Sequence, residues 1–171
     1  MKKHEEPLSP EALLLDRYLG QYKRCIRRKR ALERRRDEIV KEFEYPLGSV
    51  NYDGMPKGSG EGVGCAALSF RLDEIDTRIK EQLHKSVKVL ASIMDVIEFL
   101  PENSIERSIF EHRYIDRMSW ERICNEVHLS RTPSSNHWKR GLYELLEFKK
   151  IQQLMSEYDK ELKENDFMGD Y

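Results

Sequence analysis

Two long stretches of apolar side chains at helical spacing constrain the fold of this chain more than any other feature. The first begins after Ser9 and places two rows of residues along one helix: Leu15, Tyr22, Lys29, Arg36 and Phe43, beside Tyr18, Cys25, Leu32 and Ile39. The second ends at Pro101 and contains Leu68, Leu72, Ile75, Ile79, Leu83, Leu90, Ile93, Ile97 and Leu100. Each stretch covers roughly 35 residues, or roughly 50 Å of helix. Equal lengths predict a long antiparallel helical hairpin over residues 9–100.

A glycine-rich segment, residues 46–64, separates the two stretches. Its glycines suggest a phosphate-binding loop, but the segment matches neither G-x-x-x-x-G-K-[ST] nor G-x-G-x-x-G, and no strand is expected before it. We therefore predict a hairpin loop over residues 45–64 and no nucleotide cofactor.

The composition favours an all-α fold. Charged residues make up 36% of the chain and aromatic residues 9%, with nine glycines and six prolines, which is typical of long helices with solvated flanks. The cysteines, Cys25, Cys65 and Cys124, are odd in number and far apart, which argues against a disulfide framework and indicates a reducing compartment. The chain has no signal-like N-terminus and no run of 18 apolar residues, so we expect a cytoplasmic protein without membrane contact.

Shorter helical segments are predicted after Pro101. The first covers residues 104–115. Its side chains predicted to face the core are Ile105, Ile109, Phe110 and Tyr114. Ser119 caps the second, whose apolar stripe contains Trp120, Ile123, Cys124 and Val127. After a break at 128–130, a last helical run extends from about Pro133 to Lys163. We therefore expect a helix-turn-helix domain over 101–147 and a helical extension with an acidic tail over 148–171.

The helix after the turn has two sides of different character. One side carries Ser134, Trp138, Gly141 and Leu145, and the opposite side carries Thr132, Ser135, Asn136, Lys139 and Tyr143. Asparagine can pair with adenine, hydroxyl groups can donate or accept, and lysine can bind phosphate or guanine. Arginines precede and flank this outer side, where contacts with the DNA backbone are expected. The residues predicted to bind double-stranded DNA are Arg131, Thr132, Ser135, Asn136, Lys139 and Arg140.

The start of this helix and the role of its outer side each have an alternative. Either Ser130 or Thr132 can be the N-cap, because Pro133 favours the first helical position and disfavours helical geometry in the residue before it. The outer side can also be a simple solvated surface. The distribution of charge favours DNA: the net charge of the chain is −1, yet residues 128–143 contain no acid.

The segment ERSIFEHRYIDRMSWERICNEVHLSRTPSSNHWKRGLYELLE, residues 106–147, resembles the promoter-reading helix-turn-helix of bacterial sigma factors. The likeness lies in an R-Y-x-x-x-x-S-W-x-x-I pattern formed by Arg113, Tyr114, Ser119, Trp120 and Ile123. The linker NYDGMPKGSG, a long helix and this module together are similar to small phage-encoded transcriptional regulators of the RinA and ArpU type, which drive late or lysis-related genes. This likeness covers residues 45–147.

The resemblance implies a transcriptional activator in a bacterial host cell. It implies that promoter DNA is contacted by Arg131, Thr132, Ser135, Asn136 and Lys139. The helical hairpin is then expected to form a homodimer or to contact RNA polymerase. Related modules carry aliphatic residues at the positions of Ser134 and His137 and alanine at Gly141, so the inner packing of this helix is expected to be thinner, with Trp138 filling the gap.

Two other functions fit the same elements. A DNA-packaging recognition subunit of the small-terminase kind also joins a helix-turn-helix to helical oligomerisation segments, and it predicts ring assembly on a packaging site. A helical protein-protein adaptor predicts no DNA binding. Solution mass and DNA titration distinguish these alternatives from a regulator.

The first helical stretch is strongly basic, with ten lysines and arginines against one acid, Glu33, in residues 17–36. This segment can be a second nucleic-acid contact, a solvated face or the contact of an acidic partner. Cys124 and His128 have a spacing that can share a metal ion, but two ligands do not make a site. No catalytic motif is present, so we predict neither an enzyme nor a metal or cofactor site.

Overall fold

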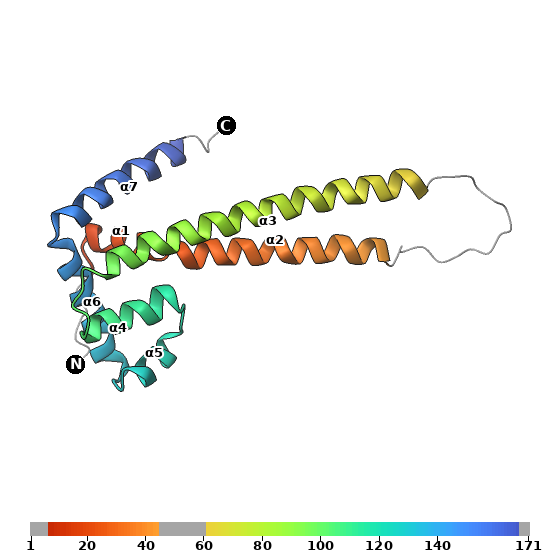
Figure 1. The fold of residues 1–171 in the computed structure, drawn as a ribbon. Helices are drawn as coiled ribbons and strands as arrows, with labels where there is room; N and C mark the ends of the chain where they lie inside the picture. Colours follow the sequence, from red (N-terminus) through yellow and green to blue (C-terminus); the bar gives the residue numbers. More distant parts are fainter. Residues whose placement is uncertain (1–6, 45–60, 168–171) are drawn as a thin grey trace. The chain divides into compact units, whose positions relative to one another are not determined.

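The computed structural model describes residues 7–44 and 61–167, which are mainly helical and contain no strand (Figure 1). The predicted all-α class is confirmed. None of the described helices combines the length with the apolar character that a membrane span requires. By their internal contacts the described residues form two units, one of residues 7–23 and 88–167 and the other of residues 24–87.

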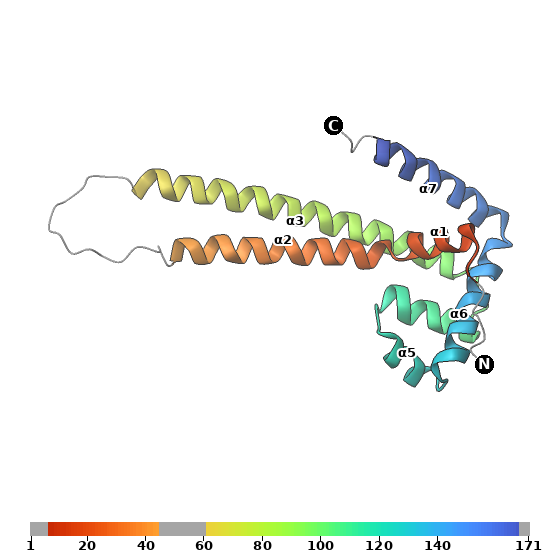
Figure 2. The same ribbon diagram turned by 180° about the vertical axis from the view of Figure 1, so that it is seen from behind.

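The second unit is a pair of antiparallel helical segments that belong to α2 (Gln21–Glu44) and α3 (Glu61–Ile97) (Figures 1 and 2). Nε of Arg36 lies 2.7 Å from Oδ1 of Asp76, and Nε2 of Gln82 donates to the carbonyl oxygen of Cys25 over 3.4 Å. The predicted loop covers residues 45–64. Residues 45–60 of it lie outside the described residues, and residues 61–64 form the start of α3.

The predicted apolar row of α3 is wrong at Leu83, whose side chain is 47% exposed. The buried positions are Gln82 and Ser86, which continue the alternating three- and four-residue spacing of Ile75 and Ile79. Regular helical geometry therefore decides which side of α3 faces α2, even where polar residues occupy that side.

The first unit begins with α1 (Pro10–Leu19), which is capped as predicted: Oγ of Ser9 accepts a hydrogen bond from N of Ala12 over 3.2 Å. The prediction of one uninterrupted helical run from residue 9 is wrong, because α1 ends at Leu19 and α2 begins at Gln21, with Gly20 between them. Gly20 weakens a helix there because it has the largest backbone entropy to lose.

Three helices and a π-helical segment lie between Pro101 and Glu147. They are α4 (Ile105–Phe110), η1 (Glu111–Ile115), α5 (Trp120–Glu126) and α6 (Arg131–Leu146). The predicted inward positions Ile109, Phe110 and Tyr114 are confirmed, but Ile105 is 41% exposed and Glu106 is buried in its place. Because successive helical residues differ by about 100°, Ile105 falls at the edge of the inward stripe.

The predicted last helical run is two helices, α6 and α7 (Lys149–Phe167), separated at Glu147 and Phe148. The amides of these two residues donate to the carbonyl oxygens of Glu144 and Leu145, three positions earlier, which tightens the last turn of α6. The ring of Phe148 then packs 5.0 Å from the ring of Phe99, measured between centroids. Packing against the end of α3 therefore accompanies a break that no glycine or proline marks.

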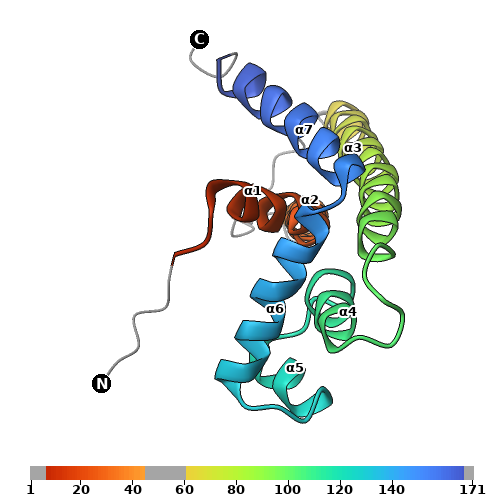
Figure 3. The same ribbon diagram turned by 90° about the vertical axis from the view of Figure 1, so that its left-hand side faces the viewer.

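The apolar core of the first unit combines helices from both ends of the chain (Figure 3). Its fully buried members include Leu15 and Leu19 of α1, Ile97 of α3, Ile109 of α4 and Leu145 of α6. The predicted domain boundaries at residues 100 and 147 remain predictions, but the helices on either side of residue 100 share this one core.

Candidate nucleic-acid interface

The helices α5 and α6 are joined by a four-residue turn, residues 127–130. Oγ of Ser119 caps α5 by accepting a hydrogen bond from N of Arg122 over 3.4 Å. At the other end His128 has a left-handed φ of 54°, and N of Leu129 donates to the carbonyl oxygen of Cys124 over 3.0 Å. These contacts form a Schellman motif, which ends α5 sharply and sets the direction in which α6 leaves the turn.

The N-cap of α6 is Ser130, so the alternative start at Thr132 is wrong. The carbonyl oxygen of Ser130 accepts from both N and Oγ of Ser134, over 3.1 Å and 3.0 Å. Pro133 is the third residue of the helix, where a missing N–H costs no hydrogen bond within the helix. Arg131 and Thr132 therefore belong to the first turn of α6 instead of to a lengthened loop.

The predicted inner side of α6 is confirmed, since its four residues Ser134, Trp138, Gly141 and Leu145 are buried. The expected thin packing is wrong. A Cβ atom built on Gly141 would lie 2.7 Å from Cε2 of Phe110 and 3.3 Å from Cβ of Glu106, so the ring of Phe110 already occupies this space. Gly141 thus allows α4 and α6 to approach more closely than an alanine would.

The outer side of α6 presents polar groups without carboxylates in its first three turns. Thr132 and Asn136 are exposed, and Ser135 and Lys139 are half-buried. Their spacing of i, i+3, i+4 and i+7 places the four side chains in one stripe along the helix. We call these four residues the polar stripe. It combines a cation with amide and hydroxyl groups that can hydrogen-bond to base edges.

The two predicted arginines of α6 are held by other side chains. The guanidinium carbon of Arg131 lies 4.0 Å from the ring centroid of Trp120, a cation–π contact. Nη1 of Arg140 lies 3.2 Å from Oε1 of Glu106, although the Arg140 side chain is 66% exposed. The Arg131 contact orients its charge beside the N-terminus of α6, and the Arg140 charge is partly neutralised.

Glu106 is a buried acid that the sequence did not identify as part of this region. Its Oε1 lies 2.8 Å from Nδ1 of His137 and also pairs with Arg140. Burial on its own raises the pKa of Glu106, but the hydrogen bond with His137 and the electrostatic attraction of the neighbouring His137 and Arg140 outweigh it and lower the pKa. The ionised carboxylate therefore ties α4 to the middle of α6.

Arg113 is surrounded by aromatic rings. Its guanidinium carbon lies 4.6 Å from the centroid of Trp120, 5.1 Å from Trp138 and 5.6 Å from Tyr114. The rings of Trp120 and Trp138 meet edge to face with centroids 5.9 Å apart. Arg113, Tyr114 and Trp120 belong to the sequence pattern that resembles sigma factors, which gave no indication of this cluster. The cluster packs η1, α5 and α6 together.

A buried hydrogen-bonded chain connects α6 to α1. Nε1 of Trp138 donates to the Tyr114 hydroxyl over 2.8 Å, and that hydroxyl donates to Oδ1 of Asp16 over 2.6 Å. Burial, the charge of Asp16 and this hydrogen bond raise the pKa of Tyr114, so the phenol stays protonated as a donor. The inner side of α6 is thereby fixed to two other elements.

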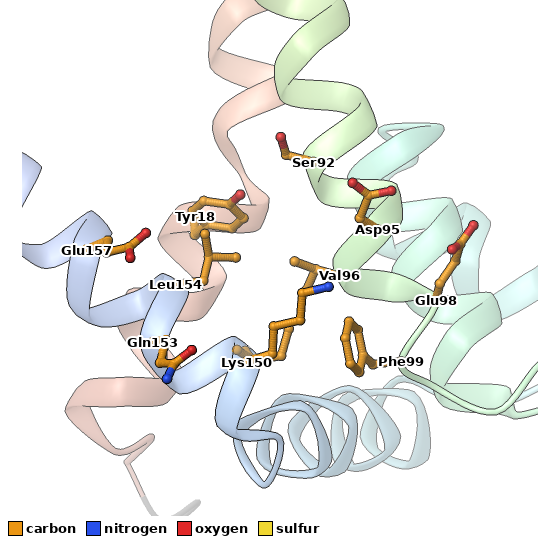
Figure 4. A pocket seen from close by; sticks show the side chains of 11 residues that line it. Tyr18, Ser92, Asp95, Val96, Glu98, Phe99, Lys150, Gln153, Leu154 and Glu157 are labelled. Atoms are coloured by element: carbon orange, nitrogen blue, oxygen red, sulfur yellow. The ribbon is translucent and has the colours of Figure 1, made fainter.

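Another surface feature of the first unit is a cavity of about 800 Å³ between α1, the end of α3 and α7 (Figure 4). Its apolar wall includes Val96, Phe99 and Leu154. Its charged groups are the three carboxylates of Asp95, Glu98 and Glu157 and the single ammonium group of Lys150. This balance repels phosphate, so the cavity is not part of a nucleic-acid interface.

Within the described ranges, no group of three or more histidine, cysteine, aspartate or glutamate side chains could hold a metal ion. In comparisons with protein-family models, curated proteins and solved structures, the chain has no match. The resemblance to sigma factors and to phage regulators therefore stays a prediction from sequence.

Proposed function

We propose that this chain is a sequence-specific DNA-binding transcriptional regulator, an activator of phage or prophage genes, and that α6 reads promoter DNA. The observation that carries this proposal is the polar stripe: an acid-free row of Thr132, Ser135, Asn136 and Lys139 on a helix whose opposite side is buried. A major groove admits an α-helix and is read by amide, hydroxyl and cationic groups of this kind.

The support around α6 strengthens the proposal. Base reading needs side chains that are held in a fixed orientation, because freezing mobile groups on binding costs free energy. Trp138 and Glu106 fix the inner side of α6 through hydrogen bonds to Tyr114 and His137. Arg131 lies at the first turn, where free backbone N–H groups also favour phosphate. Promoter DNA is thus the expected ligand, with RNA polymerase or a second copy of the chain as further partners.

The test is to select bound sites from random duplex DNA with the purified chain and then to compare variants on the selected and scrambled duplexes. Asn136→Ala should cost roughly 1 to 3 kcal/mol of base discrimination. Lys139→Ala should weaken binding to both duplexes and reduce the salt slope by about 1. Asn103→Ala, which removes an exposed amide from the turn before α4, is the matched control and should leave both quantities unchanged.

Selection that enriches no sequence, or an Asn136→Ala variant with the wild-type preference between the duplexes, would contradict the proposal. The mass of the chain in solution tests the DNA-packaging alternative, because ring assembly predicts a large multiple of the 20.4 kDa chain mass.

A further inference from the structure

The second unit carries a row of exposed arginines that the proposed reading of DNA by α6 does not use. They are Arg24, Arg27, Arg28, Arg30, Arg34 and Arg35, here called the arginine face. At about 100° per residue they fall within less than half of the circumference of α2. The opposite side of α2, with Cys25 and Leu32, turns toward α3.

The protein neutralises little of the charge at Arg27, Arg30 and Arg34. Glu33 is the only acid between Arg24 and Arg35, and it pairs with Lys29 over 2.7 Å on a different side of the helix. Arg36 pairs with Asp76 of α3. Within the described residues, Arg27, Arg30 and Arg34 form no ion pair. A concentrated positive potential therefore remains on a chain whose net charge is −1.

The arginine face continues into a groove of about 520 Å³ between the two helical segments of this unit. Arg28 and Arg35 of α2 line one wall, and Arg78 and Lys85 of α3 line the other. Glu81 is the single acid of the lining. Arg78 pairs with Glu74 over 2.6 Å, so Arg28 and Arg35 of α2 and Lys85 of α3 are the cations that border a hollow surface able to receive an anionic chain.

We propose that the arginine face binds the phosphate backbone of duplex DNA without reading its sequence. This inference rests on the proposed function, namely that the chain binds DNA. The guanidinium group donates two parallel hydrogen bonds to phosphate oxygens, which makes arginine the preferred residue for this contact. From residue 24 to 35 the helix rises roughly 17 Å, which corresponds to about five phosphates of one strand at 3.4 Å each.

Other polyanionic partners fit the arginine face less well. A stable protein interface needs a central aromatic or aliphatic anchor, and a helix on a membrane surface needs an exposed apolar side. The apolar residues of this part of α2 are all buried or half-buried: Cys25, Ile26, Ala31 and Leu32. The exposed surface therefore offers charge and no apolar anchor, which matches a phosphate backbone.

The test uses the full-length triple variant Arg27→Gln/Arg30→Gln/Arg34→Gln, with duplexes that carry the selected site or a scrambled sequence. Binding is measured by fluorescence anisotropy across a salt series. The dependence of log K on log salt should flatten by about 2 to 3 on both duplexes, since each lost phosphate contact removes about 0.9. The preference for the selected site should stay within twofold of wild type.

The matched control is Lys80→Gln/Lys149→Gln/Lys160→Gln, which removes the same charge from exposed positions outside the arginine face and should keep the wild-type salt slope. The substituted arginines are exposed, so the urea midpoint of the triple variant should equal that of wild type. If its midpoint falls, the second triple, Arg24→Gln/Arg28→Gln/Arg35→Gln, gives the same test from the other side of the arginine face.

The two proposals fail in different ways. If the folded triple variants keep the wild-type dependence of log K on log salt on both duplexes, the proposed role of the arginine face is overturned. This result does not depend on whether α6 reads DNA sequence. A wild-type chain that binds all duplexes equally, with a slope that still flattens in the triple variant, contradicts only sequence reading by α6. If the triple variant loses the binding of the wild-type chain to phosphatidylserine vesicles but keeps its DNA binding unchanged, the arginine face is a membrane contact and the proposal is overturned.

Discussion

At the residue scale, the periodicity of the sequence predicts which side chains of α6 are buried but not what they contact. Trp138 and Leu145 are inside as predicted, because a helix has only one side that can meet its neighbours. The partners of Gly141 and His137 come from α4, more than 30 residues earlier. Such contacts depend on tertiary packing, which the local pattern does not contain.

Gly141→Ala should destabilise the first unit. The added methyl group would lie 2.7 Å from the ring of Phe110, which is fully buried and would have to shift. Overpacking costs roughly 1 to 3 kcal/mol, which exceeds the gain of about 1 kcal/mol from the better helix propensity of alanine. Urea denaturation should therefore show a lower free energy of unfolding than wild type.

The comparator is Gly20→Ala, where the same substitution should have the opposite effect. Gly20 has a φ of −72°, which every L-residue can adopt, so alanine should stabilise by roughly 0.4 to 1 kcal/mol. A Gly141→Ala variant as stable as Gly20→Ala would mean that α4 and α6 are not in close contact at this point.

Glu106 should make the stability of the first unit depend on pH. Its pKa in the folded chain lies below the ordinary value of 4.5, so its contribution is fully present above pH 4.5 and is lost as the pH falls through the folded pKa. Glu106→Gln should lower the free energy of unfolding near neutral pH by roughly 1.5 to 3 kcal/mol, the range for hydrogen bonds to charged groups.

Urea titrations at a series of pH values check this prediction, since the difference between wild type and Glu106→Gln should shrink below pH 4.5. Glu111→Gln is the control, because this carboxylate pairs with Arg107 but its side chain is 43% exposed, so water can replace the contact and the loss should be smaller than that of Glu106→Gln. A difference between wild type and Glu106→Gln that is constant with pH would show that the carboxylate charge has no role.

At the scale of elements, the starts of three serine-capped helices were predicted well, and helix breaks were not. Ser9, Ser104 and Ser119 each cap a helix by accepting a backbone hydrogen bond, and this local chemistry is visible in the sequence. The break at Phe148 has no local signal, because it accompanies packing against Phe99. The π-helical segment η1 is likewise absent from the sequence pattern.

Tyr114→Phe should weaken the attachment of α1 and α6 to η1. It removes the hydroxyl that accepts from Nε1 of Trp138 and donates to Asp16, and it leaves the indole N–H without its partner. A buried donor without an acceptor costs roughly 1 to 3 kcal/mol. Urea denaturation followed by tryptophan fluorescence measures this loss.

Tyr143→Phe is the matched control for Tyr114→Phe. The Tyr143 hydroxyl accepts from N of Ser9 over 3.2 Å, but the residue is 43% exposed, so water can replace this contact. The expected loss is well below that of Tyr114→Phe. Equal losses in the two variants would contradict the role assigned to the buried chain of hydrogen bonds.

At the scale of the whole molecule, the sequence predicted a boundary near residue 100, while the contacts group residues 7–23 with 88–167. Pro101 follows the end of α3 closely, but the apolar core continues on both sides of it. Among the side chains that the structure describes between residues 24 and 87, none belongs to the apolar core, and the buried ones are Cys25, Gln82 and Ser86. The stability of the first unit therefore resides in segments from the two ends of the chain.

Replacement of residues 24–87 by a short glycine-serine linker should leave a folded first unit. Its two cut ends lie near each other, since Gln21, Lys88 and Val89 line one cavity of about 220 Å³. The shortened chain should unfold cooperatively in urea and, if the polar stripe reads DNA, should keep the preference for the selected site with a reduced salt slope.

Residues 24–87 alone should show no cooperative transition, because so small an apolar core does not offset the entropy of ordering two helices. Loss of cooperative unfolding in the shortened chain would mean that the hairpin segments are required for the core that supports α6.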